Sequence, residues 1–110
     1  MRRAGRVDGN HERIVNVLRL AGCSVLSLAD VGEGVPDLLV YSPRIHTAFL
    51  AEVKDGARVP SERALTGPQL RFVQEWAGPV FVVTNETEAL AAADGSGVTA
   101  MVYEARRKAP

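Results

Sequence analysis

Two carboxylates and a lysine are the residues of this chain whose types and spacing suit chemistry: Asp37, Glu52 and Lys54. Asp37 lies in the segment 34–40 (GVPDLLV), and the other two end the segment 48–54 (AFLAEVK). Both segments have the apolar composition of short strands, and strand side chains alternate between faces, so Glu52 and Lys54 share one face. If the segments pair as a hairpin, Asp37 joins them. Such a set suits the binding of a magnesium ion and an attacking water beside a phosphodiester.

A structural ion pair at a sheet edge is the alternative interpretation of Glu52 and Lys54. Glutamate and lysine are depleted in strands and seldom buried unpaired, but perturbed charges also occur in structural pairs. The pair alone therefore does not separate the two interpretations. The sequence Gly34-Val35-Pro36-Asp37 at the right distance upstream favours catalysis.

The composition indicates one soluble globular domain over residues 1–110, with 46% hydrophobic and 24% charged residues. The formal net charge is zero, so any binding of nucleic acid must depend on local basic patches. Basic residues gather at 1–8 and 104–110, which are expected to be flexible tails or contacts to nucleic acid. Cys23 is the only cysteine and is expected to be a buried structural thiol. With no apolar run of membrane-spanning length, these features predict a cytoplasmic protein.

The apolar periodicity and the turn residues predict an α/β fold in the order α-β-β-β-α-β-α-β. The expected sheet is mixed, flanked by helices, antiparallel at the hairpin and parallel where the second helix crosses over. Asn10 or Asp8 is expected to cap the first helix and Thr66 the second, whose apolar side contains Val73 and Trp76. The expected helices span residues 10–21, 66–76 and 85–93, and the expected strands span residues 23–28, 37–42, 47–54, 80–84 and 98–103.

Three motifs in this order resemble the PD-(D/E)XK nuclease superfamily: Gly34-x-Pro36-Asp37, Glu52-x-Lys54, and the helix opening Leu65-Thr66-x-Pro68-Gln69. The resemblance is to its small single-domain members, which include the VRR-NUC type, the archaeal Holliday-junction-resolvase type and short phage or prophage proteins. It extends from about residue 8 to residue 93. It implies a restriction-endonuclease-like αβββαβ core.

The resemblance also implies roles for individual residues. Asp37 and Glu52 would bind a divalent metal, magnesium with manganese as a substitute, and the carbonyl of Val53 would be a further ligand. Lys54 would orient the attacking water and stabilise charge on the phosphate. Gln69 matches a glutamine that the VRR-NUC type carries near its site; the alternative is an exposed residue at the helix start.

Many members of the superfamily place an acid on the first helix, and Glu12 is the candidate for this position. Helical phasing turns Glu12 toward the polar side, with Asn16 and Arg19, and places His11 closer to the core edge. Two interpretations of Glu12 thus stay open, a site residue and part of a solvated face, and His11 is a second candidate for the site.

Arg58, Arg63 and Arg71 follow the catalytic strand and are the candidate contacts to DNA phosphates. The segment 55–65, which contains Arg58 and Arg63, is a candidate flap over the substrate. Together these features predict a magnesium-dependent nuclease that cuts DNA, selective for a junction, flap or end, and active as a homodimer. The alternatives are a non-catalytic module of nuclease fold that binds DNA or serves in assembly, and a nuclease that cuts RNA.

Overall fold

The computed structural model describes residues 9–96, and this part of the chain forms an α/β fold with three α-helices and a four-stranded mixed sheet. The elements in chain order are α1 (His11–Leu20), β1 (Ser24–Ser27), β2 (Leu38–Ser42), β3 (Thr47–Val53), a 3₁₀ turn (Pro60–Glu62), α2 (Gly67–Glu75), β4 (Val80–Val83) and α3 (Glu86–Asp94). The predicted succession of elements is confirmed as far as residue 94. The predicted strand at 98–103 and the predicted tails at 1–8 and 104–110 lie outside the described residues.

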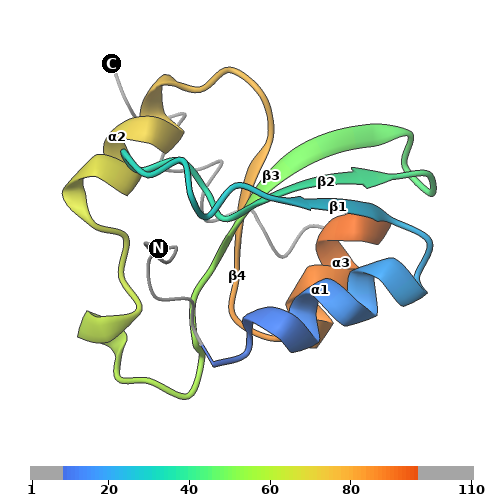
Figure 1. The fold of residues 1–110 in the computed structure, drawn as a ribbon, viewed down its shortest axis with the longest axis horizontal. Helices are drawn as coiled ribbons and strands as arrows, with labels where there is room; N and C mark the ends of the chain where they lie inside the picture. Colours follow the sequence, from blue (N-terminus) through green and yellow to red (C-terminus); the bar gives the residue numbers. More distant parts are fainter. Residues whose placement is uncertain (1–8, 97–110) are drawn as a thin grey trace.

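The sheet has the strand order β1-β2-β3-β4, as Figure 1 shows. Neighbouring strands β1, β2 and β3 are antiparallel, whereas β3 and β4 are parallel and are joined by the crossover through α2. The predicted mixture of antiparallel and parallel pairs is confirmed. A parallel pair needs such a crossover because the chain must return to the same end of the sheet.

Helices α1 and α3 lie against each other and cover one face of the sheet, and α2 lies on the other face (Figure 1). The larger core fills the space under α1 and α3, with Ile14, Leu38 and Phe49 among its members. A smaller core under α2 contains Leu50, Val73 and Val80. Side chains of β3 alternate between the two cores, since Leu50 faces α2 and Ala51 faces α1 and α3.

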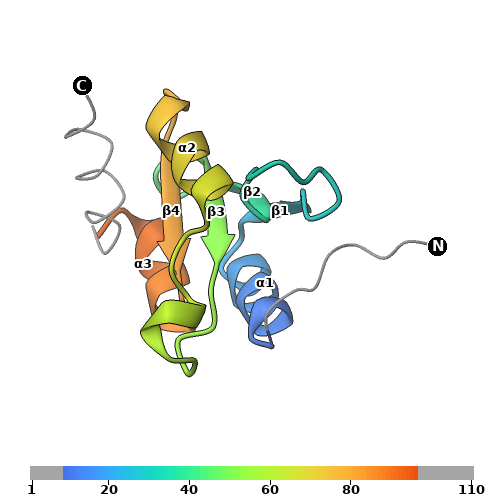
Figure 2. The ribbon, with the colours of Figure 1, turned by 90° about the vertical axis from the view of Figure 1, so that its left-hand side faces the viewer.

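The connection from β3 to α2 runs away from the sheet, makes the 3₁₀ turn and returns to the start of α2 (Figure 2). Thr66 caps α2 as predicted: its hydroxyl accepts from the backbone N–H of Gln69, and the Gln69 side chain accepts from the backbone N–H of Thr66. Only Val73 of the apolar side of α2 is buried, and Trp76 remains 45% exposed. Helix α2 therefore packs on the sheet through a small core, in which Phe72 lies partly buried beside Val73.

Two predictions about the elements are wrong in detail. Asp37 and Lys54 lie one residue outside β2 and β3 rather than within them. Asn10 occupies the position before α1, but its side chain makes no capping bond and donates elsewhere, to Lys54 and Thr84. Among residues 9–96, no helix is long and apolar enough to cross a membrane.

Cys23 is buried in the larger core, as predicted. Burial raises the pKa of its thiol, and a hydrogen bond with Ser42 opposes the rise. A buried thiol of this kind is a structural residue and a poor nucleophile.

Candidate active site

Glu52 and Lys54 lie on the α2 face of the sheet, where β3 ends. Glu52 is 4% exposed, and its Oε2 lies 3.7 Å from the ammonium nitrogen of Lys54. The residue between them, Val53, packs into the opposite core. The expectation that the two charged side chains share a face is confirmed.

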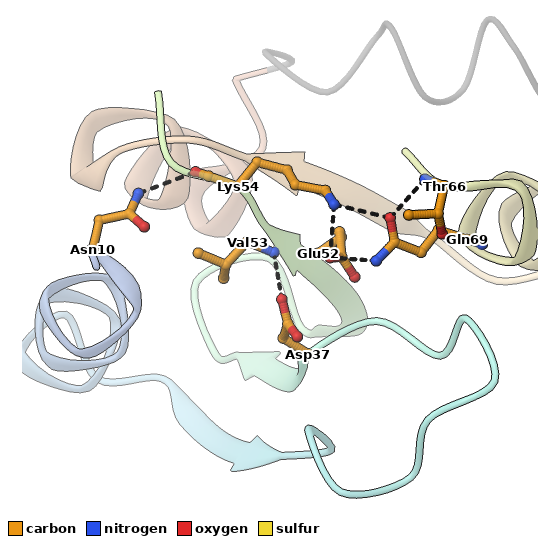
Figure 3. Close-up of polar contacts among 7 residues, drawn as sticks. All are labelled: Asn10, Asp37, Glu52, Val53, Lys54, Thr66 and Gln69. Atoms are coloured by element: carbon orange, nitrogen blue, oxygen red, sulfur yellow. Dashed lines mark hydrogen bonds and ion pairs between the residues drawn. The ribbon is translucent and has the colours of Figure 1, made fainter. Parts of the chain in front are cut away.

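Asp37 lies opposite Glu52. Leu38 pairs with Ala51, so the same antiparallel register places Asp37 across from Glu52. The Asp37 carboxylate accepts a hydrogen bond of 2.9 Å from the backbone N–H of Val53 (Figure 3). The structure thus brings together the three residues that the sequence placed in one site: Asp37, Glu52 and Lys54.

Gln69 joins this group from the first turn of α2, as Figure 3 shows. Its Nε2 donates to Glu52 Oε2 at 3.1 Å, and its Oε1 accepts from the Lys54 ammonium at 2.9 Å. The same Oε1 accepts from the N–H of Thr66 at 2.9 Å. Gln69 is therefore both a helix-start residue and a member of the cluster, which the sequence treated as alternatives.

The loop before β2 packs closely against the start of α2. Gly34 has φ +81°, and a Cβ at this position would stand 2.3 Å from the carbonyl oxygen of Pro68 and 3.0 Å from the Gln69 nitrogen. Only glycine fits here, because both the backbone conformation and the close approach exclude a side chain. The glycine in Gly34-x-Pro36-Asp37 thus has a packing role.

The Val53 carbonyl lies on the side of β3 that faces β2, because the N–H and C=O of one strand residue point the same way and the Val53 N–H points to Asp37. Leu38 and Ala51 face each other, and the Val53 N–H points toward the β2 side, where Asp37 accepts it. Two residues further in this register, the residue opposite Val53 is Pro36, which has no N–H to donate. The carbonyl and the Asp37 carboxylate therefore lie on the same side of β3.

Oxygen donors of this kind suit a magnesium ion, which takes one or two carboxylates and retains several waters. Asp37 and Glu52 stand opposite each other, and like charges across a strand pair destabilise a sheet unless a cation lies between them. Lys54 provides a single positive charge at 3.7 Å. The residues present therefore fit a divalent cation. Among the described residues, no group of three or more His, Cys, Asp or Glu side chains has the arrangement of a metal site.

Glu12 is not placed with this cluster. Glu12 is exposed on α1 and lines a hollow of about 260 Å³ together with His11, Ser27 and Leu38. Leu38 belongs to the core under α1, whereas Glu52 bonds to Gln69 of α2. His11 is half-buried, and its Nε2 has no hydrogen-bond partner among residues 9–96. The phasing prediction for these two residues is confirmed, with Glu12 on the polar side and His11 nearer the core.

Two of the three candidate arginines, Arg58 and Arg63, lie together on the connection before α2, and Arg71 lies on α2 itself. Arg58 pairs with Glu62 at 2.9 Å, both side chains being more than half exposed, and Arg63 donates to the carbonyl of Arg58. Arg71 is exposed on α2. Arg63 also lines a polar hollow of about 290 Å³ near the carboxyl ends of β3 and β4.

Sequence reasoning missed Asn10 as a residue that holds the site. Asn10 is 2% exposed and donates to the carbonyls of Lys54 and Thr84. An asparagine just before a helix indicates an N-cap in a sequence, and no local signal distinguishes that role from a bond to residues 44 and 74 positions away.

Comparison of the chain with protein-family models, with curated proteins and with solved structures finds no match.

Proposed function

We propose that this protein is a metal-dependent nuclease that hydrolyses phosphodiester bonds in DNA. One observation carries the proposal: Asp37 stands opposite the buried Glu52, and the Lys54 ammonium lies 3.7 Å from the Glu52 carboxylate on the same face. Burying a charged group costs several kcal/mol unless it is well paired, and this cost is on the order of the free energy of unfolding of a whole domain. Well-packed apolar side chains would serve stability at least as well, so the cluster is better explained by chemistry.

Asp37, Glu52 and the carbonyl of Val53 are the groups that would hold a magnesium or manganese ion. When bound, such an ion supplies a positive charge beside the phosphate and lowers the pKa of a coordinated water. In the net reaction, the oxygen of water bonds to phosphorus and one ester P–O bond breaks. The products are a phosphomonoester and an alcohol, with the two hydrogens of water shared between them and the solvent.

Lys54 and Gln69 have separate roles in the proposed reaction. In the proposed mechanism, the Lys54 ammonium orients the attacking water and stabilises the charge that develops on the phosphate oxygens. Gln69 fixes its partners by accepting from Lys54 and donating to Glu52. Holding two groups in reactive positions in advance removes an entropic cost from the transition state.

Phosphate binding would depend on local charge, since the formal net charge of the chain is zero. Arg71 is exposed on the helix that carries Gln69. Arg58 and Arg63 lie on the connection that leads to this helix. Such contacts position a nucleic acid without reading its sequence. A structure-selective enzyme, acting on a junction, flap or end, is consistent with recognition of this kind.

A second function is favoured by a specific observation. The Oε2 atom of Glu52 is engaged by an ion pair with Lys54 and by a hydrogen bond from Gln69, which is the arrangement of a structural ion pair. A non-catalytic module of the same fold, binding DNA or serving in assembly, would keep these bonds unchanged. The two functions differ in whether a divalent ion binds.

The test is cleavage of linear duplex, single-stranded, flap and four-way-junction DNA and of a matched RNA, each with magnesium, manganese or EDTA. The variant Glu52→Gln keeps the shape of the side chain and removes its charge. Glu88→Gln is the matched control, because Glu88 is a half-buried carboxylate that accepts from Thr84 outside the cluster. We expect cleavage and metal-dependent thermal stabilisation to be lost in Glu52→Gln and retained in Glu88→Gln. No cleavage and no thermal shift in the wild type would reject the nuclease in favour of the binding module.

A further inference from the structure

Asn10 is a buried amide that connects the first helix to the ends of two strands. Its Nδ2 donates to the carbonyl of Lys54 at 3.1 Å and to the carbonyl of Thr84 at 2.7 Å. Lys54 directly follows β3 and Thr84 directly follows β4. The side chain is 2% exposed, so water does not compete for these two carbonyls. Figure 3 shows the amide reaching from α1 to the backbone of Lys54.

The Asn10 amide takes the place of a missing bond in the parallel ladder. Lys54 donates its N–H to the carbonyl of Val83 at 3.0 Å, as a residue of the ladder does. In a parallel ladder, a residue that donates to one residue of the neighbouring strand accepts from the residue two positions further along that strand. The Lys54 carbonyl would therefore accept from the N–H of residue 85. Asn85 instead begins α3, where its side chain accepts from the N–H of Glu88. Asn10 therefore supplies the donor that the ladder lacks.

The Lys54 backbone is consequently fixed on both sides although the residue lies outside the strand. Its N–H is held by β4 and its carbonyl by Asn10, so only the side-chain torsions remain to place the ammonium. The ammonium reaches Gln69 at 2.9 Å and Glu52 at 3.7 Å. A shift of the backbone at this point changes the position from which the side chain must reach these two partners.

We propose that Asn10 is a positioning residue: by holding the Lys54 carbonyl it fixes where the Lys54 ammonium stands beside Glu52 and Gln69. The inference rests on the proposed nuclease function for its kinetic consequence. The carboxylates of Asp37 and Glu52 are held by bonds to Val53 and Gln69, so loss of Asn10 leaves these two metal-binding side chains in place. The effect then falls on the group that acts in the transition state, which lowers kcat and leaves KM unchanged.

The experiment compares Asn10→Ala and Asn10→Asp with Asn85→Ala. Asn10→Asp keeps the size of the side chain, but a carboxylate cannot donate to the two carbonyls. Asn85→Ala is the control, since Asn85 also precedes a helix and loses one local bond. We expect both Asn10 variants to lower kcat at least about tenfold, with KM and the magnesium requirement within about twofold. The control is expected to stay within about twofold in all three parameters.

A second readout does not depend on activity. Nuclear Overhauser contacts between the Lys54 ε-methylene and the Gln69 side chain report the position of the ammonium group. We expect these contacts to weaken in the Asn10 variants and to persist in Asn85→Ala, at temperatures where each variant is folded. If Asn10→Asp does not fold, Asn10→Ser, which keeps one donor, replaces it and is expected to give an intermediate loss.

The two proposals fail in different ways. A wild-type protein that cuts no DNA or RNA rejects the nuclease function, and the Overhauser contacts then decide the role of Asn10 alone. If folded Asn10→Ala keeps the wild-type kcat and the wild-type Overhauser contacts between Lys54 and Gln69, Asn10 serves stability only and the inference is overturned.

Discussion

The contact between Gly34 and the start of α2 gives the sharpest test of how the site is assembled. Gly32 and Gly34 lie in the same turn with similar backbone angles, φ +76° and φ +81°. A Cβ on Gly32 meets nothing within 4 Å, whereas a Cβ on Gly34 meets the Pro68 carbonyl oxygen at 2.3 Å and its carbon at 2.5 Å. The variants Gly32→Ala and Gly34→Ala therefore share a backbone cost, and only the second adds a collision with α2.

The expected losses in the free energy of unfolding follow from the backbone cost and the collision with α2. The left-handed conformation costs a non-glycine residue about 1–2 kcal/mol, and the reduced freedom of the unfolded chain returns about 0.4–1 kcal/mol. Gly32→Ala is thus expected to lower the free energy of unfolding by about 0.5–1.5 kcal/mol. The Pro68 carbonyl is backbone and cannot rotate away, so Gly34→Ala adds an overpacking cost of about 1–3 kcal/mol. The total for Gly34→Ala is then about 1.5–4.5 kcal/mol.

Urea unfolding measures both variants, with the fluorescence of Trp76 and far-ultraviolet circular dichroism as independent probes. Trp76 is the only tryptophan and follows α2 directly, so its signal reports the helix that the collision displaces. We expect a lower midpoint for Gly34→Ala than for Gly32→Ala, with similar slopes. Metal-dependent stabilisation should persist in Gly32→Ala and decline in Gly34→Ala, because the displaced helix carries Gln69 away from Glu52. Equal losses of stability in the two variants would refute the close contact between this turn and α2.

Two further predictions concern Arg58 and Cys23. Arg58→Ala removes an exposed ion pair with Glu62 and should change the free energy of unfolding by less than about 1 kcal/mol. Fluorescence anisotropy should show weaker DNA binding, and the slope of the logarithm of the binding constant against the logarithm of the salt concentration should fall by about one. Because burial raises the pKa of the Cys23 thiol, the folded protein retains this proton at a pH where the unfolded chain releases it. Stability should therefore be unaffected below about pH 8.5 and decrease as the pH rises further, and urea unfolding of Cys23→Ala should lack this decrease.

Local patterns predicted the parts of the site that depend on strand geometry. Glu52 and Lys54 share a face because side chains alternate along β3, and the hairpin register follows from two apolar segments with a short connection. Asp37 then lies opposite Glu52 with no further information. Thr66 and Gln69 have the spacing of a capping box, which placed the start of α2.

Contacts between distant segments could not be predicted in this way. The bonds of Asn10 join residues 44 and 74 positions apart, and their partners are backbone carbonyls, which are the same in every residue type. The collision between Gly34 and Pro68 likewise depends on how α2 sits on the sheet. Helical phasing placed Glu12 on the polar side, but the residues that share its hollow, Ser27 and Leu38, come from the strands.

The position of the Lys54 ammonium is decided by three such contacts acting on different atoms. Asn10 holds the Lys54 carbonyl, Gln69 holds the ammonium, and the approach of Gly34 to Pro68 holds the helix that carries Gln69. Since each contact joins a different pair of segments, no one of them can form the site until the sheet and α2 are both in place. The cluster is therefore expected to appear only in the folded protein, and a variant that loosens any one contact should disturb the chemistry of Lys54 before it unfolds the chain.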